Sequence, residues 1–195
     1  MSKHASNKHL LDFFTELGLL KRVRRSGWWT IGIKDGESVA DHSFRCAIIA
    51  YCIAQQENAD PFRAAVIALF NDIHEARIND LHKVSQRYIE LRKAEQRAAE
   101  EQLKDLPDDI GLGIYKLLKE LWDDNSHEAV IARDADILEC MLQGKEYYEQ
   151  GHTQAEAFFD DKNNHLKTET AKSLGRSLLA WNSIEWCSRL VKIER

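Results

Sequence analysis

The stretch LFNDIHE, residues 69–75, does most to decide how this chain folds and what chemistry it supports. It places the carboxylate of Asp72 among apolar residues, where a buried charge without a partner costs a great deal of free energy. His42 lies well upstream of this stretch, and Asp136 lies well downstream. Such a layout predicts a metal site that is assembled from separate helices.

The residues around Asp72 fall within about one helical turn. Asn71, His74 and Glu75 stand at i, i+3 and i+4, so we expect them on one helix face. Carboxylates as close as those of Asp72 and Glu75 raise each other's pKa unless a cation lies between them. A solvated polar face is the alternative, but it fits poorly with the apolar residues on both sides.

Each candidate ligand also has an ordinary structural explanation. Asp72 could pair with Arg45 or Arg77 rather than with a metal ion. A single histidine such as His42 is more often a surface or core residue than a ligand. Asp136 lies on a polar stripe of a helix that is otherwise largely apolar, so it could simply face solvent.

The composition is that of a globular protein. Hydrophobic residues make up 44% and charged residues 30% of the 195 positions, and the net charge of −5 argues against a surface that coats nucleic acid. No apolar run reaches about 18 residues, so we expect no membrane span, no signal peptide and a cytoplasmic protein. The cysteines show no CxxC spacing and are expected to be reduced core residues: Cys46, Cys52, Cys140 and Cys187.

Apolar spacing and helix caps predict an all-α fold. Only 2 Pro and 9 Gly interrupt the chain, and no stretch alternates with period 2. Ser38, Asp60 followed by Pro61, and Ser126 are expected helix caps, and Gly151 is an expected helix end. We therefore predict helices over about residues 10–20, 39–56, 61–77, 86–104, 106–123, 127–150 and 168–190, with loops at 25–36, 79–85 and 160–166.

Four motifs in this order resemble those of HD-domain phosphohydrolases, and the small 5'-deoxynucleotidase-like subgroup is the most similar. They are ESVADHS at 37–43, NDIHEA at 71–76, ND at 79–80 and DILE at 136–139. The resemblance extends from about residue 17 to residue 148. It implies a single compact helical HD-type domain over residues 1–195, with core motifs in 17–148 and a C-terminal helix at about 168–190.

The resemblance also assigns roles. It implies that one divalent metal ion is bound by His42, Asn71, Asp72 and Asp136. Glu75 is implied to lie near the phosphate and the attacking water, and Asp80 is expected to accept a hydrogen bond from a sugar hydroxyl. We expect Trp28 to pack on the sugar or base. Some related nucleotidases have an Arg directly before this Trp, where this chain has Gly27. Arg25, or a neighbour in the cluster of residues 22–25, is therefore the expected phosphate ligand, and His74 completes the expected substrate-binding set.

Asn71 departs from the family pattern, which has a histidine at this position. A neutral amide oxygen suits hard ions better than zinc, so among Mn, Co, Mg, Zn and Ni the pattern favours Mn or Mg if Asn71 is a ligand. Three interpretations stay open. Asn71 ligates through its oxygen, or His74 moves in to replace the missing imidazole, or the substitution inactivates the site.

The resemblance implies metal-dependent release of phosphate from (deoxy)nucleoside 5'-monophosphates. The alternatives are a nucleotide-binding protein that has lost turnover through Asn71, and a hydrolase of another ester such as a cyclic or triphosphate nucleotide. The expected partner is a small-molecule nucleotide, not a nucleic acid or a membrane. Apolar residues of the C-terminal helix either close the core or form a homodimer interface: Trp181, Ile184, Trp186 and Leu190.

Overall fold

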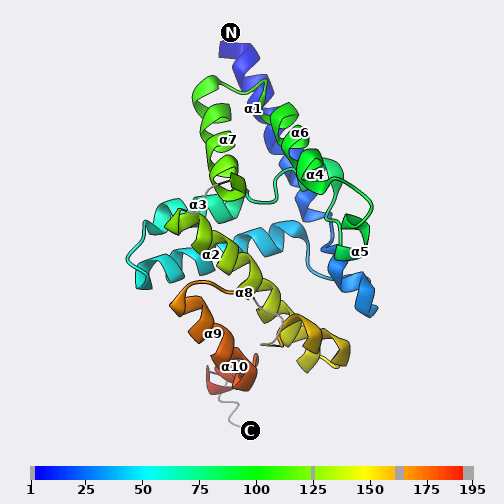
Figure 1. The fold of residues 1–195 in the computed structure, drawn as a ribbon. Helices are drawn as coiled ribbons and strands as arrows, with labels where there is room; N and C mark the ends of the chain where they lie inside the picture. The colour runs from blue at the N-terminus through cyan, green and yellow to red at the C-terminus, as the bar shows by residue number, and fades with distance from the viewer. Residues whose placement is uncertain (1–2, 124–125, 161–164, 191–195) are drawn as a thin grey trace.

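The computed structural model describes residues 3–123, 126–160 and 165–190. Over these ranges the fold is all-α, as predicted, and the one β contact is an isolated bridge between Arg24 and Ser38. In chain order the helices are α1 (Lys3–Leu17), η1 (Gly18–Lys21), η2 (Ser26–Ile31), α2 (Val39–Gln56), α3 (Pro61–Phe70), α4 (Glu75–Ile78), α5 (Lys83–Gln86), α6 (Leu91–Leu103), α7 (Asp108–Asp123), α8 (His127–Glu149), η3 (Thr153–Phe158), α9 (Glu169–Ala180) and α10 (Glu185–Leu190). Figure 1 shows α1, α6 and α7 gathered at one end of the molecule and α9 and α10 at the other, with α8 running between them. No helix in the described ranges combines the length and the apolar character that a membrane span requires.

The predicted caps begin the helices that carry the site. Ser38 Oγ accepts a hydrogen bond from the backbone N–H of Asp41 (3.1 Å), and a carboxylate oxygen of Asp41 accepts one from the backbone N–H of Ser38 (2.9 Å), so α2 opens with a capping box. Asp60 accepts hydrogen bonds from the first turn of α3, whose first residue is Pro61. Ser126 Oγ likewise accepts a backbone hydrogen bond at the start of α8. These caps fix where each helix begins and therefore which residues face the core.

Small side chains bring α2, α3 and α8 close together. Ala50, Ala64, Ala68, Ala132 and Ala135 are each at most 3% exposed and belong to one core cluster, to which α9 also contributes. A second apolar cluster packs α1, α6 and α7 against one another. Because the distance between packed helices depends on the side chains at the contact, alanines let polar residues on neighbouring helices approach each other.

The helix predicted over residues 61–77 is wrong in one respect. α3 ends at Phe70, residues 71–74 form a turn, and α4 begins at Glu75. Hydrogen bonds of the i to i−3 type, such as Ile73 N–H to Phe70 O (3.4 Å), replace the α-helical pattern here. The tightened backbone allows four residues of this segment to line one cavity, described below.

Other boundaries also differ from the prediction. The first helix begins at Lys3 rather than near residue 10, and α6 begins at Leu91 rather than near residue 86. The predicted loops at 25–36 and 79–85 contain the short helix η2 and the start of α5. Residues 161–164 of the predicted loop at 160–166 lie outside the described residues.

The helix predicted over residues 168–190 is interrupted. α9 and α10 are separated by a turn in which the side-chain oxygen of Asn182 accepts a hydrogen bond from the backbone N–H of Ile184 (3.1 Å). The four apolar residues of this segment are between 38% and 75% exposed: Trp181, Ile184, Trp186 and Leu190. The idea that they close the core is therefore wrong, and the homodimer interface stays a prediction.

Candidate metal centre and active site

Three of the candidate metal ligands lie close together, with Asp72 and Asp136 both near the imidazole of His42. This side chain lies near the start of α2 and is fully buried. Its Nε2 is 2.9 Å from Asp136 Oδ1, on α8, and 3.5 Å from Asp72 Oδ2, in the turn after α3. The structure thus brings these three side chains together from separate segments of the chain.

The other imidazole nitrogen of His42 is held by Glu139. Its Nδ1 is hydrogen-bonded to a carboxylate oxygen of Glu139. Arg45 in turn pairs with Glu139 (2.7 Å) and with Glu146 (2.7 Å). Because a carboxylate can only accept a hydrogen bond, Nδ1–H donates to Glu139 and, without a metal ion, Nε2–H donates to Asp136. A bound metal ion would take the place of the Nε2 proton, while Glu139 would still hold Nδ1–H.

Neither arginine that the sequence suggests as a partner pairs with the buried Asp72 in the described part of the chain. Arg45 is bound to glutamates of α8, and Arg77 pairs with Glu16, at 2.9 Å between Nη2 and Oε2. Among the described residues neither arginine contacts Asp72, so the arginine-pair alternative is wrong. Burial raises the pKa of Asp72, and the carboxylate of Asp136 raises it further, whereas the charges of His42 and Arg25 lower it; the net shift is upward.

This set of donors fits a divalent metal ion. One imidazole nitrogen and two carboxylate oxygens are donors that divalent ions accept in proteins. A cation between Asp72 and Asp136 would also remove their mutual repulsion. Asn71 lines the cavity that these aspartates line, so its amide oxygen is a candidate fourth donor.

Two further groups near His42 are unexpected from the sequence. Cys46 Sγ lies 3.4 Å from His42 Nε2, and burial raises the pKa of this thiol to about 12. Glu37 lies close to His42 and Glu139, and burial, then the charge of Glu139, raises the pKa of Glu37 to about 7. The position of Cys46 one helical turn after His42 is a signal that could have identified it, whereas Glu37 lies in a loop and gives none.

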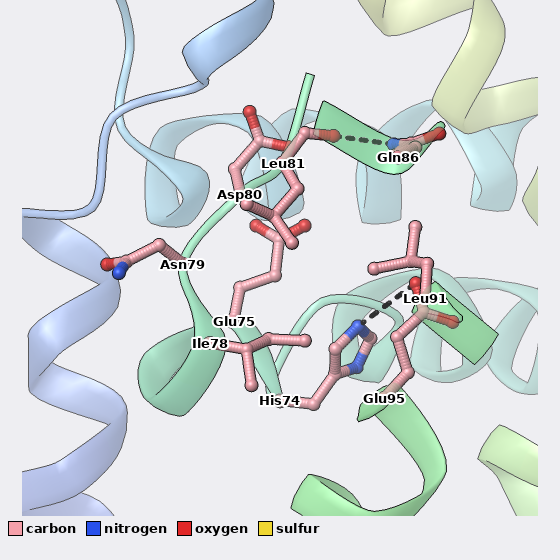
Figure 2. A pocket seen from close by; sticks show the side chains of 9 residues that line it. All are labelled: His74, Glu75, Ile78, Asn79, Asp80, Leu81, Gln86, Leu91 and Glu95. Carbon is pink, nitrogen blue, oxygen red and sulfur yellow. Dashed lines mark hydrogen bonds and ion pairs between the residues drawn. The ribbon is translucent and has the colours of Figure 1, made fainter. Parts of the chain in front are cut away.

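Glu75 and Asp80 lie beside the ligand set. Glu75 is 9% exposed, and burial, then the charges of Asp72 and Asp80, raises its pKa well above the ordinary value. Its Oε2 is buried and has no hydrogen-bond partner among the described residues. Asp80 accepts a hydrogen bond from the backbone N–H of Ser26. Figure 2 shows both acidic side chains at a small cavity of about 40 Å³.

A larger cavity of about 950 Å³ adjoins the ligand set. Asp72, Asp136 and Arg25 all line it. Burial lowers the pKa of Arg25, but several nearby negative groups, Asp136 first, together raise it by more, so the guanidinium stays charged. The cavity therefore combines metal-binding donors with a cation that suits an anionic ligand.

Trp28 and His74 line this cavity, but their side chains are almost fully buried. Trp28 is 1% exposed, its ring centroid lies 5.0 Å from that of Tyr147, and its Nε1 donates a hydrogen bond to Glu37 (3.1 Å). His74 is 3% exposed, and its Nε2 lies 3.7 Å from Glu95 Oε1, as Figure 2 shows. His74 therefore pairs with Glu95 and does not replace the imidazole missing at position 71.

Comparison with known proteins identifies the family. A family model described as HD domain matches residues 17–176. The chain belongs to the HD-domain family. It is 30% identical over 183 residues to the protein named 5'-deoxynucleotidase HDDC2 of Dictyostelium discoideum, which covers 86% of this chain and 95% of the relative. The human protein of the same name is 31% identical over 146 residues, which cover 74% of this chain and 71% of the relative.

Solved structures agree with this HD-domain fold. A conserved hypothetical protein from Pyrococcus furiosus is 28% identical with a TM-score of 0.73, and the match covers 88% of this chain and 99% of that one. A predicted metal-dependent phosphohydrolase from Magnetospirillum magnetotacticum, 20% identical with a TM-score of 0.70, shares the fold. Membership of the family implies a divalent metal ion, and Asn71 remains the departure from its pattern.

The HD-domain cavity has a second wall that no sequence motif predicts. It is formed by Arg92 and Glu95 from α6 and by Trp122 from α7. Charged residues on an amphipathic surface helix are common, so neither Arg92 nor Glu95 stands out in the sequence. The tryptophan near the end of α7 is the one signal, and it is equally typical of an apolar core.

Proposed function

We propose that this HD-domain protein is a metal-dependent phosphohydrolase that releases phosphate from (deoxy)nucleoside 5'-monophosphates. The observation that carries the proposal is the convergence of His42 Nε2, Asp72 and Asp136 beside a cavity that Arg25 and Glu75 also line. The relatives named 5'-deoxynucleotidase support this class of substrate. A cytoplasmic location stays a prediction from the sequence.

His42 Nε2, Asp72 and Asp136 would hold the metal ion, with the amide oxygen of Asn71 as the fourth protein ligand. When bound, such an ion lowers the pKa of a bound water and polarises a phosphoryl oxygen. Three oxygen donors and one nitrogen favour a hard ion, so we expect Mn²⁺ or Mg²⁺ to support more activity than Zn²⁺. Glu139 keeps the imidazole of His42 in the orientation that this requires.

Glu75 and Arg25 would carry out proton transfer and phosphate binding. Glu75 Oε2, buried without a partner among the described residues, would accept a hydrogen bond from the attacking water and take its proton. The raised pKa of this carboxyl makes it a stronger base than an exposed glutamate. The planar guanidinium of Arg25 would pair with two phosphate oxygens.

Asp80 and Trp28 would shape the space around the sugar. Asp80 Oδ2 accepts the backbone hydrogen bond from Ser26, so its Oδ1 is the atom that would accept a hydrogen bond from a sugar hydroxyl. Trp28 is 1% exposed, so it would limit the space beside the sugar as part of the wall rather than offer an open stacking surface.

Phosphate release by the purified protein tests the proposal. We expect the wild type with Mn²⁺ or Mg²⁺ to release phosphate from dAMP and other deoxynucleoside monophosphates. Asn71→His should raise kcat/KM with Zn²⁺ by about 10–100-fold, because an imidazole is a better zinc ligand than an amide. Cyclic and triphosphate nucleotides in the same assay test whether another ester is the preferred substrate.

Asn71 is also the observation that favours a second candidate, a nucleotide-binding protein without turnover. If the wild type releases no phosphate with Mn²⁺, Co²⁺ or Mg²⁺, and Asn71→His restores release, the wild-type chain is not an enzyme. Binding of dAMP to the wild type, measured by calorimetry, would then support the binding function.

A further inference from the structure

In the second wall of the large cavity, the side chain of Arg92 packs over the ring of Trp122. The guanidinium carbon of Arg92 lies 5.5 Å from the ring centroid of Trp122. Glu95 holds this guanidinium, with 3.0 Å between Arg92 Nη1 and Glu95 Oε2. His74 and Tyr115 contact the same indole at steep interplanar angles, with ring centroids 6.3 Å and 6.4 Å away. Trp122 and Arg92 are called the Trp122–Arg92 platform below.

The Trp122–Arg92 platform is accessible from the cavity. The Arg92 side chain is 55% exposed, whereas the Glu95 side chain that orients it is 15% exposed. Arg92 and Trp122 both line the cavity that the metal-binding residues line. A planar group that is already oriented at a cavity wall can be covered by a flat ligand at little entropic cost.

The platform and the metal ligands are linked by one turn of the chain. Asp72 and His74 both lie in the turn after α3, where Asp72 faces His42 and His74 faces Glu95 and Trp122. The cavity between them measures about 950 Å³. This volume is at the upper end of the range of roughly 300–1,000 Å³ that is usual for small-molecule sites, so it has room for more than a sugar phosphate.

We propose that the Trp122–Arg92 platform is a nucleobase subsite, on which the base of the substrate stacks against the guanidinium plane of Arg92. This inference rests on the proposed phosphohydrolase function, because the phosphate must lie at the metal end for the base to reach the platform. Nucleobases stack on aromatic rings and on arginine guanidinium planes. Purines present a larger face than pyrimidines, so purine nucleotides gain more from the platform.

Steady-state kinetics with two matched substrates test the subsite. dAMP carries a base, and 2-deoxyribose 5-phosphate is the same sugar phosphate without one. Arg92→Ala is expected to raise the KM for dAMP about tenfold with kcat nearly unchanged, and to leave kcat/KM for 2-deoxyribose 5-phosphate within about twofold of the wild type. Arg92→Lys keeps the positive charge but removes the planar guanidinium, so its KM for dAMP should rise as in Arg92→Ala.

Lys93→Ala is the control, and two variants at Trp122 test the ring that lies against Arg92. Lys93 is an exposed neighbour that pairs with Glu90 (2.8 Å), and Lys93→Ala should leave the kinetics of both substrates unchanged. Trp122→Phe keeps an aromatic ring and should keep a low KM for dAMP, whereas Trp122→Leu should raise it. Equal losses on both substrates in Arg92→Ala, or a wild-type KM for dAMP in Arg92→Lys, would overturn the stacking role.

A failure of the subsite can be distinguished from a failure of the proposed function. If the wild type releases phosphate but Arg92→Ala affects dAMP no more than the sugar phosphate, the subsite is wrong and the function stands. If the wild type releases no phosphate from either, the function is wrong, and calorimetric titration with both compounds tests the subsite alone. Weaker binding of dAMP to Arg92→Ala, with no change for 2-deoxyribose 5-phosphate, supports the subsite, and equal binding of dAMP to both proteins overturns it.

Discussion

The metal end and the platform end of the cavity differ in how firmly their side chains are held. At the metal end, His42 is fully buried, and contacts at both ring nitrogens fix its orientation. At the platform end, the Arg92 side chain is 55% exposed and is held by one carboxylate and one aromatic ring. Catalytic and metal-binding groups must be positioned to about 0.5 Å, whereas a flat ligand tolerates a surface that moves. One end of the cavity is therefore suited to chemistry and the other to recognition.

The largest expected effect is a difference in activity between variants of Asp72 and His74, which lie in the same turn. Asp72→Asn keeps the side-chain shape but removes an anionic ligand, so kcat/KM with Mn²⁺ should fall by about 10³-fold or more. His74 lies two residues later and faces Glu95. His74→Gln should therefore lower kcat/KM by less than about tenfold, mainly by raising KM. Steady-state kinetics and the metal content of each variant check this, and similar losses in both variants would contradict the division of the cavity.

The next effect concerns proton transfer at the metal end. Glu75→Gln should reduce kcat by about 10²–10⁴-fold, the usual contribution of general acid–base catalysis, while the metal content stays that of the wild type. Burial, then the charges of Asp72 and Asp80, raises the pKa of Glu75 well above 4.5, and the proton-accepting carboxylate is lost as the pH falls through this raised value. The wild-type pH–rate profile should therefore decline on the acid side well above pH 4.5, and the residual activity of Glu75→Gln should lack this limb. If the variant keeps the acid limb, another group titrates there.

A smaller effect tests what orients the metal ligand. Glu139→Gln should weaken metal affinity by about 10–100-fold, because the Nδ1–H of His42 loses its anionic acceptor. Glu146→Gln is the matched control, since Glu146 also pairs with Arg45 and is not among the groups that contact His42 in the described chain. Titration of activity with Mn²⁺ measures both affinities. Equal weakening by the two variants would show that Arg45, and not Glu139, orients the imidazole.

The smallest expected effect is a change in stability when Glu37, which lies close to His42 and Glu139, is substituted. Burial and the charge of Glu139 raise the pKa of Glu37 from 4.5 to about 7. A carboxyl whose pKa rises on folding stabilises the folded state below its unfolded pKa and loses that contribution as the pH rises through its folded pKa. Glu37→Gln keeps an acceptor for Trp28 and removes the charge, so the free energy of unfolding at pH 8 in EDTA should rise by about 1–3 kcal/mol, with little change at pH 4. Denaturant unfolding at both pH values measures this, and a loss of stability at pH 8 would show that the charge is stabilising.

The parts of this molecule that the sequence predicts are those where a residue type is chemically unusual in its setting. A carboxylate among apolar residues singles out Asp72, and polar caps at Ser38 and Ser126 locate the helices around it. The errors in the helices arise from short-range backbone geometry. Hydrogen bonds of the i to i−3 type end α3 at Phe70, and a side-chain turn at Asn182 divides the predicted C-terminal helix.

The platform end is beyond sequence reasoning for a different reason. Arg92, Glu95 and Trp122 have ordinary identities for surface helices, and only the packing of α6 against α7 brings them together. The same holds for Glu37, which lies in a loop and is brought close to His42 and Glu139 by tertiary packing. Rare residues mark the chemistry, whereas tertiary contacts create the surface that would recognise the rest of the substrate.

Ser26 has a consequence for how the products would leave. It directly follows Arg25, its backbone N–H donates to Asp80, and its Oγ accepts a hydrogen bond from the backbone N–H of His82 (2.9 Å). The residues that would bind the phosphate and the sugar are therefore positioned by one serine, so their contributions to affinity should not be additive. A nucleotide that spans both groups benefits from this coupling. After hydrolysis neither the nucleoside nor the phosphate spans them, so each product should bind more weakly than the substrate.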